Sequence, residues 1–273
     1  MPELPEVETT IRCLTPKLQG LEVTSFKLRF PGIVGNKEEK ILKKFRGKKI
    51  TGLRRRGKWI LIDFDSDLSL LCHLKMTGQF LFCSSKDPID KHTHFILCFK
   101  DRKEELRFRD VRKFGSISCH LTSEVLSFPQ LGPEPLEVSF YRFRRLFQGR
   151  RGRLKSLLLN QNFIAGIGNI YADEILFEAK LHPLTPVFLL GEDELRILWK
   201  AMRFVLRKAL KYRGTSIRDF KDAEGKEGDF QSHLRVYGKE SIPCSRCRKR
   251  IERLRLGGRS SFFCSRCQKE KRC

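Results

Sequence analysis

Residues 244–267, CSRCRKRIERLRLGGRSSFFCSRC, decide how the C-terminal end of this chain folds. Two C-x2-C pairs are separated by 16 residues, a spacing that can place four thiolates tetrahedrally around one zinc ion. Between the pairs, two short strand-like runs flank the glycines at 257–258, so we expect a β-hairpin. Four thiolates leave no open coordination position, and the predicted zinc is therefore structural. Its ligands would be Cys244, Cys247, Cys264 and Cys267.

The composition indicates a polyanionic partner. The 273 residues include 56 Lys and Arg against 32 Asp and Glu, a formal charge of +24. A folded protein of this charge commonly binds DNA, RNA or an anionic membrane surface. No apolar run reaches the ~18–20 residues of a membrane span, and the acidic, proline-bearing start is not a secretory signal. We expect a cytoplasmic protein, in which paired cysteines favour metal over disulfides.

The N-terminal half predicts one helix followed by a β-sandwich. Apolar residues at helical spacing follow Pro5, and Pro16 should end or kink this helix. From about residue 21 to 121, short runs rich in β-branched and aromatic residues alternate with polar turns, as in a sandwich. The helical positions are Val7, Ile11, Leu14 and Leu18.

The C-terminal half predicts helices before the hairpin, so the fold class is α+β and multidomain. Residues 127–140 hold three prolines and a glycine and indicate an interdomain linker. The expected order is a catalytic β-sandwich domain (1–122), a linker (123–131), a helical domain (132–222), a loop end and connector (223–234), a zinc hairpin (235–269) and a tail (270–273).

A glycine turn in residues 162–174, NFIAGIGNIYADE, is a candidate phosphate site. Gly166 and Gly168 precede a helix that begins near Asn169, and exposed backbone N–H groups at a helix start bind phosphate. The turn lacks the lysine of a P-loop, and small-residue turns between helices are common. Nearby cations for the same backbone are Arg150, Arg151, Arg153 and Lys155.

Two motifs, HLKMTG and DVRKFG, place apolar side chains beside a cation at probable strand ends. Met76 and Phe114, next to Arg112, suit a protein that must unstack and kink a duplex. The alternative is that Met76 and Phe114 are core residues. His73 and His92, taken singly, are more often structural than functional.

The opening MPELPEVE raises a chemical possibility. Removal of Met1 would leave Pro2 with a secondary amine at the terminus, and an α-amino group has a pKa of ~8 against ~10.4 for lysine. Such an amine can attack an aldehyde-like carbon, and Glu3 and Glu6 lie close enough to donate protons. The alternative is that this stretch merely starts a helix.

Motifs along essentially the whole chain match those of one family and occur in the same order. They are MPELPEVET, RRRGKWIL, HLKMTG, DVRKFG, AGIGNIYADEILF, TSIRDF, GDFQSHLRVYG and GRSSFFCSRCQ with its two cysteine pairs. The chain resembles bacterial formamidopyrimidine-DNA glycosylases. The resemblance implies a bifunctional enzyme that excises oxidised purines such as 8-oxoguanine and then cleaves the strand.

The resemblance also implies a role for each matching residue. Pro2 would be the nucleophile and Glu3 the general acid, with Glu6 in support, while Lys58 would act in β-elimination and Arg259 in δ-elimination. A helix–two-turn–helix element would lie within 132–222, and residues 214–231 would cover the damaged base. Contacts to DNA are implied for His73, Met76, His92, Arg112, Phe114, Arg150, Lys155, Asn169 and Tyr237.

Departures from the family are slight, and the rival interpretations differ in chemistry. Arg150 stands where lysine is common, and Asn160 replaces a usual aspartate. One rival is an endonuclease VIII-like glycosylase for oxidised pyrimidines; PELPEVE and the long TSIRDF…GDFQ loop weigh against it. Others are a non-catalytic DNA-binding zinc protein and an RNA-binding protein.

The expected partner is duplex DNA with oxidised bases or abasic sites. No membrane or protein partner is implied, and we expect a monomer.

Overall fold

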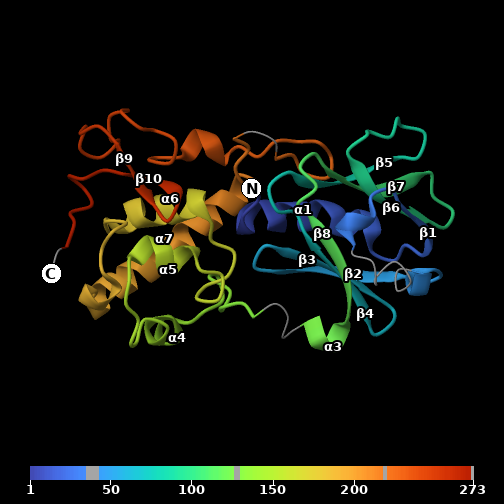
Figure 1. The fold of residues 1–273 in the computed structure, drawn as a ribbon, viewed down its shortest axis with the longest axis horizontal. Helices are drawn as coiled ribbons and strands as arrows, with labels where there is room; N and C mark the ends of the chain where they lie inside the picture. Colours follow the sequence, from blue (N-terminus) through green and yellow to red (C-terminus); the bar gives the residue numbers. More distant parts are fainter. Residues whose placement is uncertain (35–42, 126–129, 218–219, 272–273) are drawn as a thin grey trace. The chain divides into compact units, whose positions relative to one another are not determined.

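The structure, a computed structural model, describes residues 1–34, 43–125, 130–217 and 220–271 (Figure 1). Contacts divide the chain into two units: Met1–Gln130 with Tyr212–Asp229, and Leu131–Lys211 with Phe230–Cys273. Segment 212–229 therefore packs with the N-terminal unit, although it follows the helices in sequence. Parts of the predicted linker (126–129), damaged-base loop (218–219) and tail (272–273) lie outside the described residues.

Two four-stranded antiparallel sheets form the first unit, which confirms the predicted sandwich. One sheet has the order β1 (Val23–Leu28), β6 (Thr93–Phe99), β7 (Glu104–Asp110), β5 (Gly78–Ser84), and the other has β2 (Ile50–Arg56), β3 (Trp59–Phe64), β4 (Leu68–His73), β8 (Ser116–Leu121). Apolar side chains of both sheets share one buried core. Short helical turns complete the unit: η1 (Pro31–Ile33), η2 (Lys43–Phe45) and α3 (Thr122–Val125).

Helix α1 (Leu4–Leu18) covers this core with its apolar face, as the sequence predicts. Val7, Ile11, Leu14 and Leu18 are all buried. Pro16 lies inside the last turn, where its ring removes one backbone donor, and the helix ends at Leu18. The packed face holds the first residues of the chain against the sandwich.

The second unit is helical around one central helix. Helix α6 (Asn169–Ala179) is buried on nearly every side, and its neighbours are α5, α7 and strand β10. A helix buried on nearly all sides lies in a core, and α6 buries even the acids Asp173 and Glu174. The other elements are α4 (Phe140–Arg145), α5 (Leu154–Leu159), η3 (Val187–Leu189), α7 (Glu192–Lys211), η4 (Phe230–His233), β9 (Glu252–Leu256) and β10 (Arg259–Phe263).

The predicted hairpin is present as strands β9 and β10. Leu256 pairs with Arg259, so the loop has two residues, Gly257 at φ +55° and Gly258 at φ +75°. Positive φ at both loop residues defines the tight turn whose twist matches the strands, and glycine adopts it without steric cost. Arg259 therefore follows the tip directly. None of the helices in the described ranges is long and apolar enough to cross a membrane.

Candidate functional site

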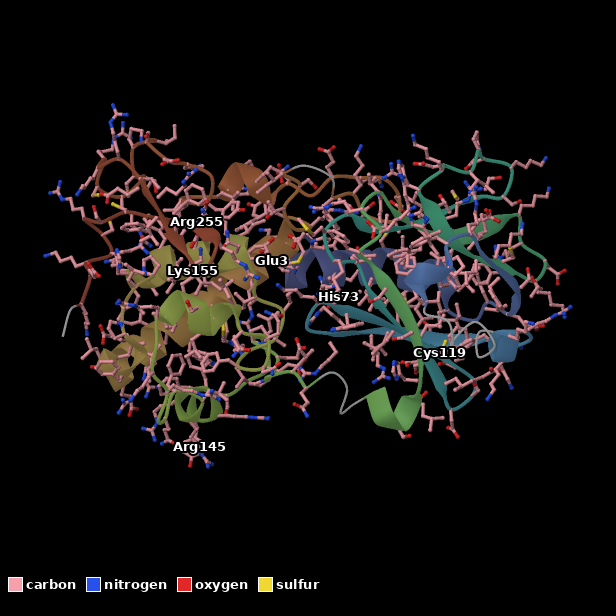
Figure 2. The ribbon with its side chains drawn as sticks, viewed as in Figure 1. Glu3, His73, Cys119, Arg145, Lys155 and Arg255 are labelled. Atoms are coloured by element: carbon pink, nitrogen blue, oxygen red, sulfur yellow. The ribbon has the colours of Figure 1, made fainter. Side chains whose placement is uncertain are left out.

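The N-terminal residues are held by a buried carboxylate. Pro2 is buried, and Glu3 and Glu6 are 2% and 1% exposed; Figure 2 labels Glu3 at the start of α1. The Glu3 N–H donates to Glu6 Oε2 at 2.7 Å, and the Thr215 N–H donates to Glu6 Oε1 at 2.7 Å. One side chain thus fixes both the start of the chain and the start of the predicted damaged-base loop.

The two ends of segment 212–229 meet beside Glu6. Gly214 has φ +82°, and a Cβ there would lie 2.7 Å from Glu6 Oε1. A Cβ on Gly228 would lie 2.3 Å from the Gly214 carbonyl oxygen, while the Asp229 N–H donates to the Tyr212 carbonyl at 2.8 Å. Glycine is therefore required at both ends of this segment.

Lys58, in the turn between β2 and β3, lies close to His73, the last residue of β4. Lys58 is 6% exposed and precedes Trp59, which pairs with His73 across β3 and β4. The Lys75 N–H donates to His73 Nδ1 at 2.8 Å, so the neutral ring carries its proton on Nε2. Burial, together with the charges of Lys75 and Lys58, lowers the pKa of His73 to about 3. His73 can donate one hydrogen bond to a phosphate but is not a cation at neutral pH.

The residues predicted as wedges are exposed. Met76 is 41% and Phe114 52% exposed, and the Arg112 guanidinium lies 4.7 Å from the centre of the Phe114 ring. The alternative of core residues is therefore wrong for both. Asp110, which the sequence analysis missed, shapes this turn: its carboxylate accepts the N–H groups of Arg112 (3.2 Å) and Gly115 (2.6 Å).

Lys155, one of the predicted DNA contacts, is held by buried partners within the second unit, and its contact with DNA stays a prediction. Its side chain is 0% exposed, and its amine lies 2.7 Å from Asp173 Oδ1. It also donates to the Ser260 carbonyl at 2.9 Å and the Ser261 hydroxyl at 2.7 Å. Burial raises the pKa of Asp173 to about 7, although Lys155 lowers it. The lysine supports β10 just after Arg259.

Neighbouring groups hold the other residues of the second unit that are predicted to contact DNA. Asn169 begins α6 and donates to the Ser260 carbonyl at 3.0 Å. Glu174, also missed, is 3% exposed and accepts the N–H groups of Arg235, Val236 and Tyr237 at 2.9–3.0 Å. The sequence signal for Glu174 is its place, next to Asp173, inside a largely apolar helix. Three further predicted residues reach solvent: Arg150 and Arg259 are exposed and His92 is half-buried.

The four cysteines form the expected metal site. Their sulfur atoms all lie within 4.8 Å of one another, with 3.4 Å between Cys247 and Cys264 and 3.9 Å between Cys244 and Cys267. A tetrahedral site with zinc–sulfur bonds near 2.3 Å needs sulfurs about 3.8 Å apart, so the donor set fits zinc. The Arg246 N–H points at the Cys244 sulfur at 3.4 Å, a contact that stabilises a bound thiolate. The zinc is structural because no open position remains.

The fold and the site define a multidomain zinc protein of the nucleic-acid-binding class. It combines a β-sandwich that has a buried N-terminal site, a helical unit and a four-cysteine hairpin. Three family models match: the formamidopyrimidine-DNA glycosylase N-terminal domain (1–117), its H2TH domain (131–221) and the zinc finger found in FPG and IleRS (241–269). The chain belongs to the formamidopyrimidine-DNA glycosylase family, which confirms the resemblance, the fold class and the structural zinc.

Individual relatives match over nearly their whole length. A formamidopyrimidine-DNA glycosylase of Desulforamulus reducens is 44% identical over 93% of this chain and 94% of its own. The Lactococcus lactis Fpg in complex with DNA containing an abasic site has a TM-score of 0.92 and 36% identity, covering 98% of this chain and 100% of that one. The wild-type L. lactis protein in complex with DNA containing an oxidised pyrimidine has a TM-score of 0.92 and 35% identity, with the same coverage.

Proposed function

We propose that this protein is a base-excision repair enzyme that removes oxidised purines, 8-oxoguanine and formamidopyrimidines, from duplex DNA and then cleaves the strand. The observation that carries the proposal is the buried Glu6, which fixes the backbone of Glu3 and Thr215 at once. Such an anchor holds the terminal residue of a processed chain at a constant position. Preorganisation of this kind converts an ordinary amine into an effective nucleophile.

The first step is displacement of the damaged base. The Pro2 nitrogen, freed by removal of Met1, attacks C1′ as the bond from C1′ to the base breaks, and the base leaves with a proton from Glu3. Opening of the sugar then gives an iminium ion between Pro2 and C1′. Glu6 is bound to backbone N–H groups and acts by positioning.

The second step is cleavage of the strand. The iminium makes the C2′ proton acidic, and its loss expels the 3′ phosphate; a further elimination expels the 5′ phosphate. Lys58 and Arg259 would transfer these protons and hold the phosphates. Water then releases Pro2 from the sugar fragment. The zinc hairpin carries Arg259 and takes no part in the bond changes.

The base must leave the stack before it can react. The exposed Met76 and Phe114, with Arg112 over the Phe114 ring, are suited to fill the gap and meet the unpaired base. Neutral His73 and exposed Arg150 are suited to hold phosphates, and these contacts predict a steep salt dependence of binding. The partner is duplex DNA in the cytoplasm, and the enzyme acts as a monomer.

A second candidate activity is removal of oxidised pyrimidines. It is favoured by the similarity to the L. lactis protein in complex with DNA containing an oxidised pyrimidine. Excision rates on matched duplexes that differ only in the damaged base would rank the two. The present proposal requires faster excision of 8-oxoguanine opposite cytosine than of an oxidised pyrimidine.

Borohydride trapping tests the proposed chemistry. Protein shown by mass spectrometry to lack Met1 is mixed with 8-oxoguanine duplex and borohydride, and the cross-linked peptide is mapped. We expect an adduct on Pro2 that undamaged duplex does not give. Pro2→Gly should lose most of the adduct, and protein that retains Met1 should give none. Tight lesion binding without any adduct from processed protein would contradict the proposal.

A further inference from the structure

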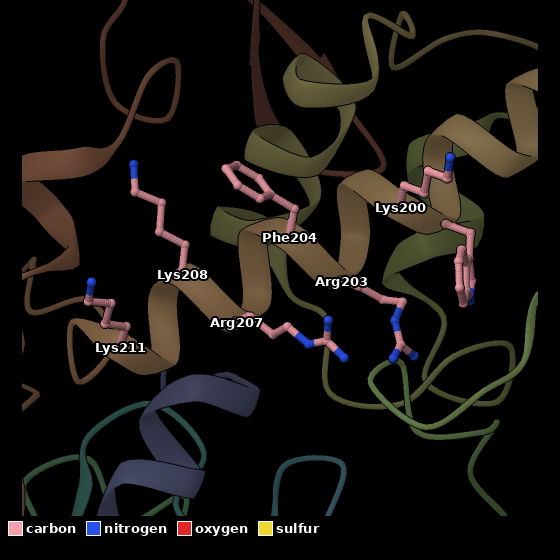
Figure 3. A pocket seen from close by; sticks show the side chains of 7 residues that line it. Lys200, Arg203, Phe204, Arg207, Lys208 and Lys211 are labelled. Atoms are coloured by element: carbon pink, nitrogen blue, oxygen red, sulfur yellow. The ribbon is translucent and has the colours of Figure 1, made fainter.

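Helix α7 carries a groove that the proposed reaction does not use. The groove has a volume of about 580 Å³ and runs along the exposed face of this one helix (Figure 3). None of the residues predicted to bind the damaged duplex lies on α7. Its basic lining consists of Lys200, Arg203, Arg207, Lys208 and Lys211.

The cations of this face lie apart from the acids of α7. The acids of α7 lie in its first turn, where Glu192 pairs with Arg144 and Arg196, and Glu194 with Lys271. Among the described residues, none of the groove cations forms an ion pair with a carboxylate. From Lys200 to Lys211 the face extends about 16 Å along the helix axis. The negative end of the helix dipole accounts for cations in the last turn but not for those further back.

One exposed aromatic side chain stands inside this line of charge. Phe204 is 53% exposed, and Figure 3 shows it between Lys200 and Lys208. Among the described residues, no ring or cation lies over it. Trp199, by contrast, donates its indole N–H to the Val138 carbonyl at 2.9 Å and is covered by Arg203 at 4.9 Å. Trp199 is therefore a wall of the groove, and Phe204 is the face available to a ligand.

We propose that this groove binds single-stranded DNA, with the phosphates along the α7 cations and a base stacked on Phe204. A line of cations around an exposed ring is how proteins hold single strands without sequence preference. A duplex presents phosphates to such a surface but keeps the faces of its bases covered, so it would leave Phe204 unused. The inference concerns a second DNA segment and does not depend on the proposed reaction.

The test measures binding to protein whose lesion site is already filled. The full-length protein is saturated with an unlabelled duplex carrying a tetrahydrofuran abasic analogue, and fluorescein-labelled dT12 is added while anisotropy is recorded. We expect dT12 to bind this complex. Phe204→Ala should weaken binding by roughly 5- to 150-fold, the range for loss of one stacked base, while Phe204→Trp should retain it. Lys200→Gln with Lys208→Gln should reduce the salt slope by about 1.4.

Matched controls remove exposed groups elsewhere. Tyr141→Ala removes an aromatic ring that is 63% exposed on α4, and Lys86→Gln with Lys103→Gln removes two exposed charges of the first unit. These variants should bind dT12 like the wild type. Excision of 8-oxoguanine, measured on every preparation, should be unchanged in the groove variants and reports separately on the reaction.

Four results would overturn the proposal. One is failure of dT12 to bind the saturated complex. Another is wild-type binding by Phe204→Ala. The third is equal binding of an undamaged 12-base-pair duplex, and the fourth is displacement of dT12 by an acidic dodecapeptide at lower concentration than by unlabelled dT12. Either of these last two would assign the groove to a different ligand.

Discussion

The two units hold their functional segments with buried carboxylates, but the carboxylates have different partners. In the first unit Glu6 accepts backbone N–H groups from Glu3 and Thr215. In the second, Asp173 accepts the Phe262 N–H at 3.0 Å and also pairs with the buried Lys155. Loss of one member of a buried ion pair costs about 3–5 kcal/mol, against about 1–3 kcal/mol for a buried hydrogen-bonding group left unsatisfied. The second anchor should therefore be the more sensitive to substitution.

The largest effect on stability is expected for Lys155→Met. The substitution leaves Asp173 buried without its cation and should lower the free energy of unfolding by about 3–5 kcal/mol, measured by urea denaturation. Because the lysine also binds Ser260 and Ser261, the tip at Arg259 should shift. The fraction of strand breaks that proceed through δ-elimination should therefore fall.

Two further variants serve as controls for this prediction. Lys155→Met combined with Asp173→Leu replaces the pair by apolar groups and should recover most of the lost stability. Arg12→Met breaks the exposed pair of Arg12 with Glu8 and should cost less than about 1 kcal/mol. A Lys155→Met protein as stable as Arg12→Met would show that burial of the pair does not matter.

The anchor of the first unit can be tested through the glycine that touches it. Gly214→Ala forces a side chain into a positive-φ position and places its Cβ 2.7 Å from Glu6 Oε1. Gly225→Ala meets the same backbone restriction, φ +79°, with nothing within 4 Å of its Cβ. Both should lose about 1–3 kcal/mol from the backbone alone. Gly214→Ala should lose more and should also trap less Pro2 adduct, while equal stabilities would contradict the close contact.

The sequence predicts what local spacing determines. The zinc hairpin follows from four cysteines and a glycine pair within 24 residues, and α1 follows from the period of Val7 to Leu18. The sandwich follows from the alternation of short apolar runs and turns. In each of these cases the residues that interact are near one another in the chain or repeat with a fixed period.

The sequence does not predict partners that lie far apart in the chain. The basic run around Lys155 predicts a contact to DNA but does not reveal its buried partners Asp173 and Ser260, which come from two other elements. Glu174 was missed because its acceptor role depends on residues 235–237. Acids inside a buried and largely apolar helix, such as Asp173 and Glu174 in α6, are the signal that can identify such anchors.

A smaller effect is expected from the pH dependence of His73. Its pKa is lowered to about 3 in the folded protein, against 6.5 when exposed. As the pH falls, the unfolded chain therefore binds the proton first. The contribution of His73 to the free energy of unfolding is full above pH 6.5 and decreases as the pH falls below it. Between pH 7.5 and pH 5 the loss is about 2 kcal/mol at 1.36 kcal/mol per unit. His73→Gln should remove this part of the dependence, and an unchanged slope in urea denaturation would contradict it.

The smallest effect on stability is expected at a surface contact between α1 and segment 212–229, the two segments that Glu6 also joins. Lys17 on α1 pairs with Glu224 of segment 212–229 at 2.9 Å, and Lys226 and Lys17 lower the pKa of Glu224 to about 2. Water screens such an exposed pair, so Glu224→Gln should change neither the urea midpoint nor trapping at Pro2 beyond experimental error. Glu6→Gln, at the buried contact, should reduce both. If the two substitutions have equal effects, segment 212–229 is held by its surface charges and the buried carboxylate is not the anchor.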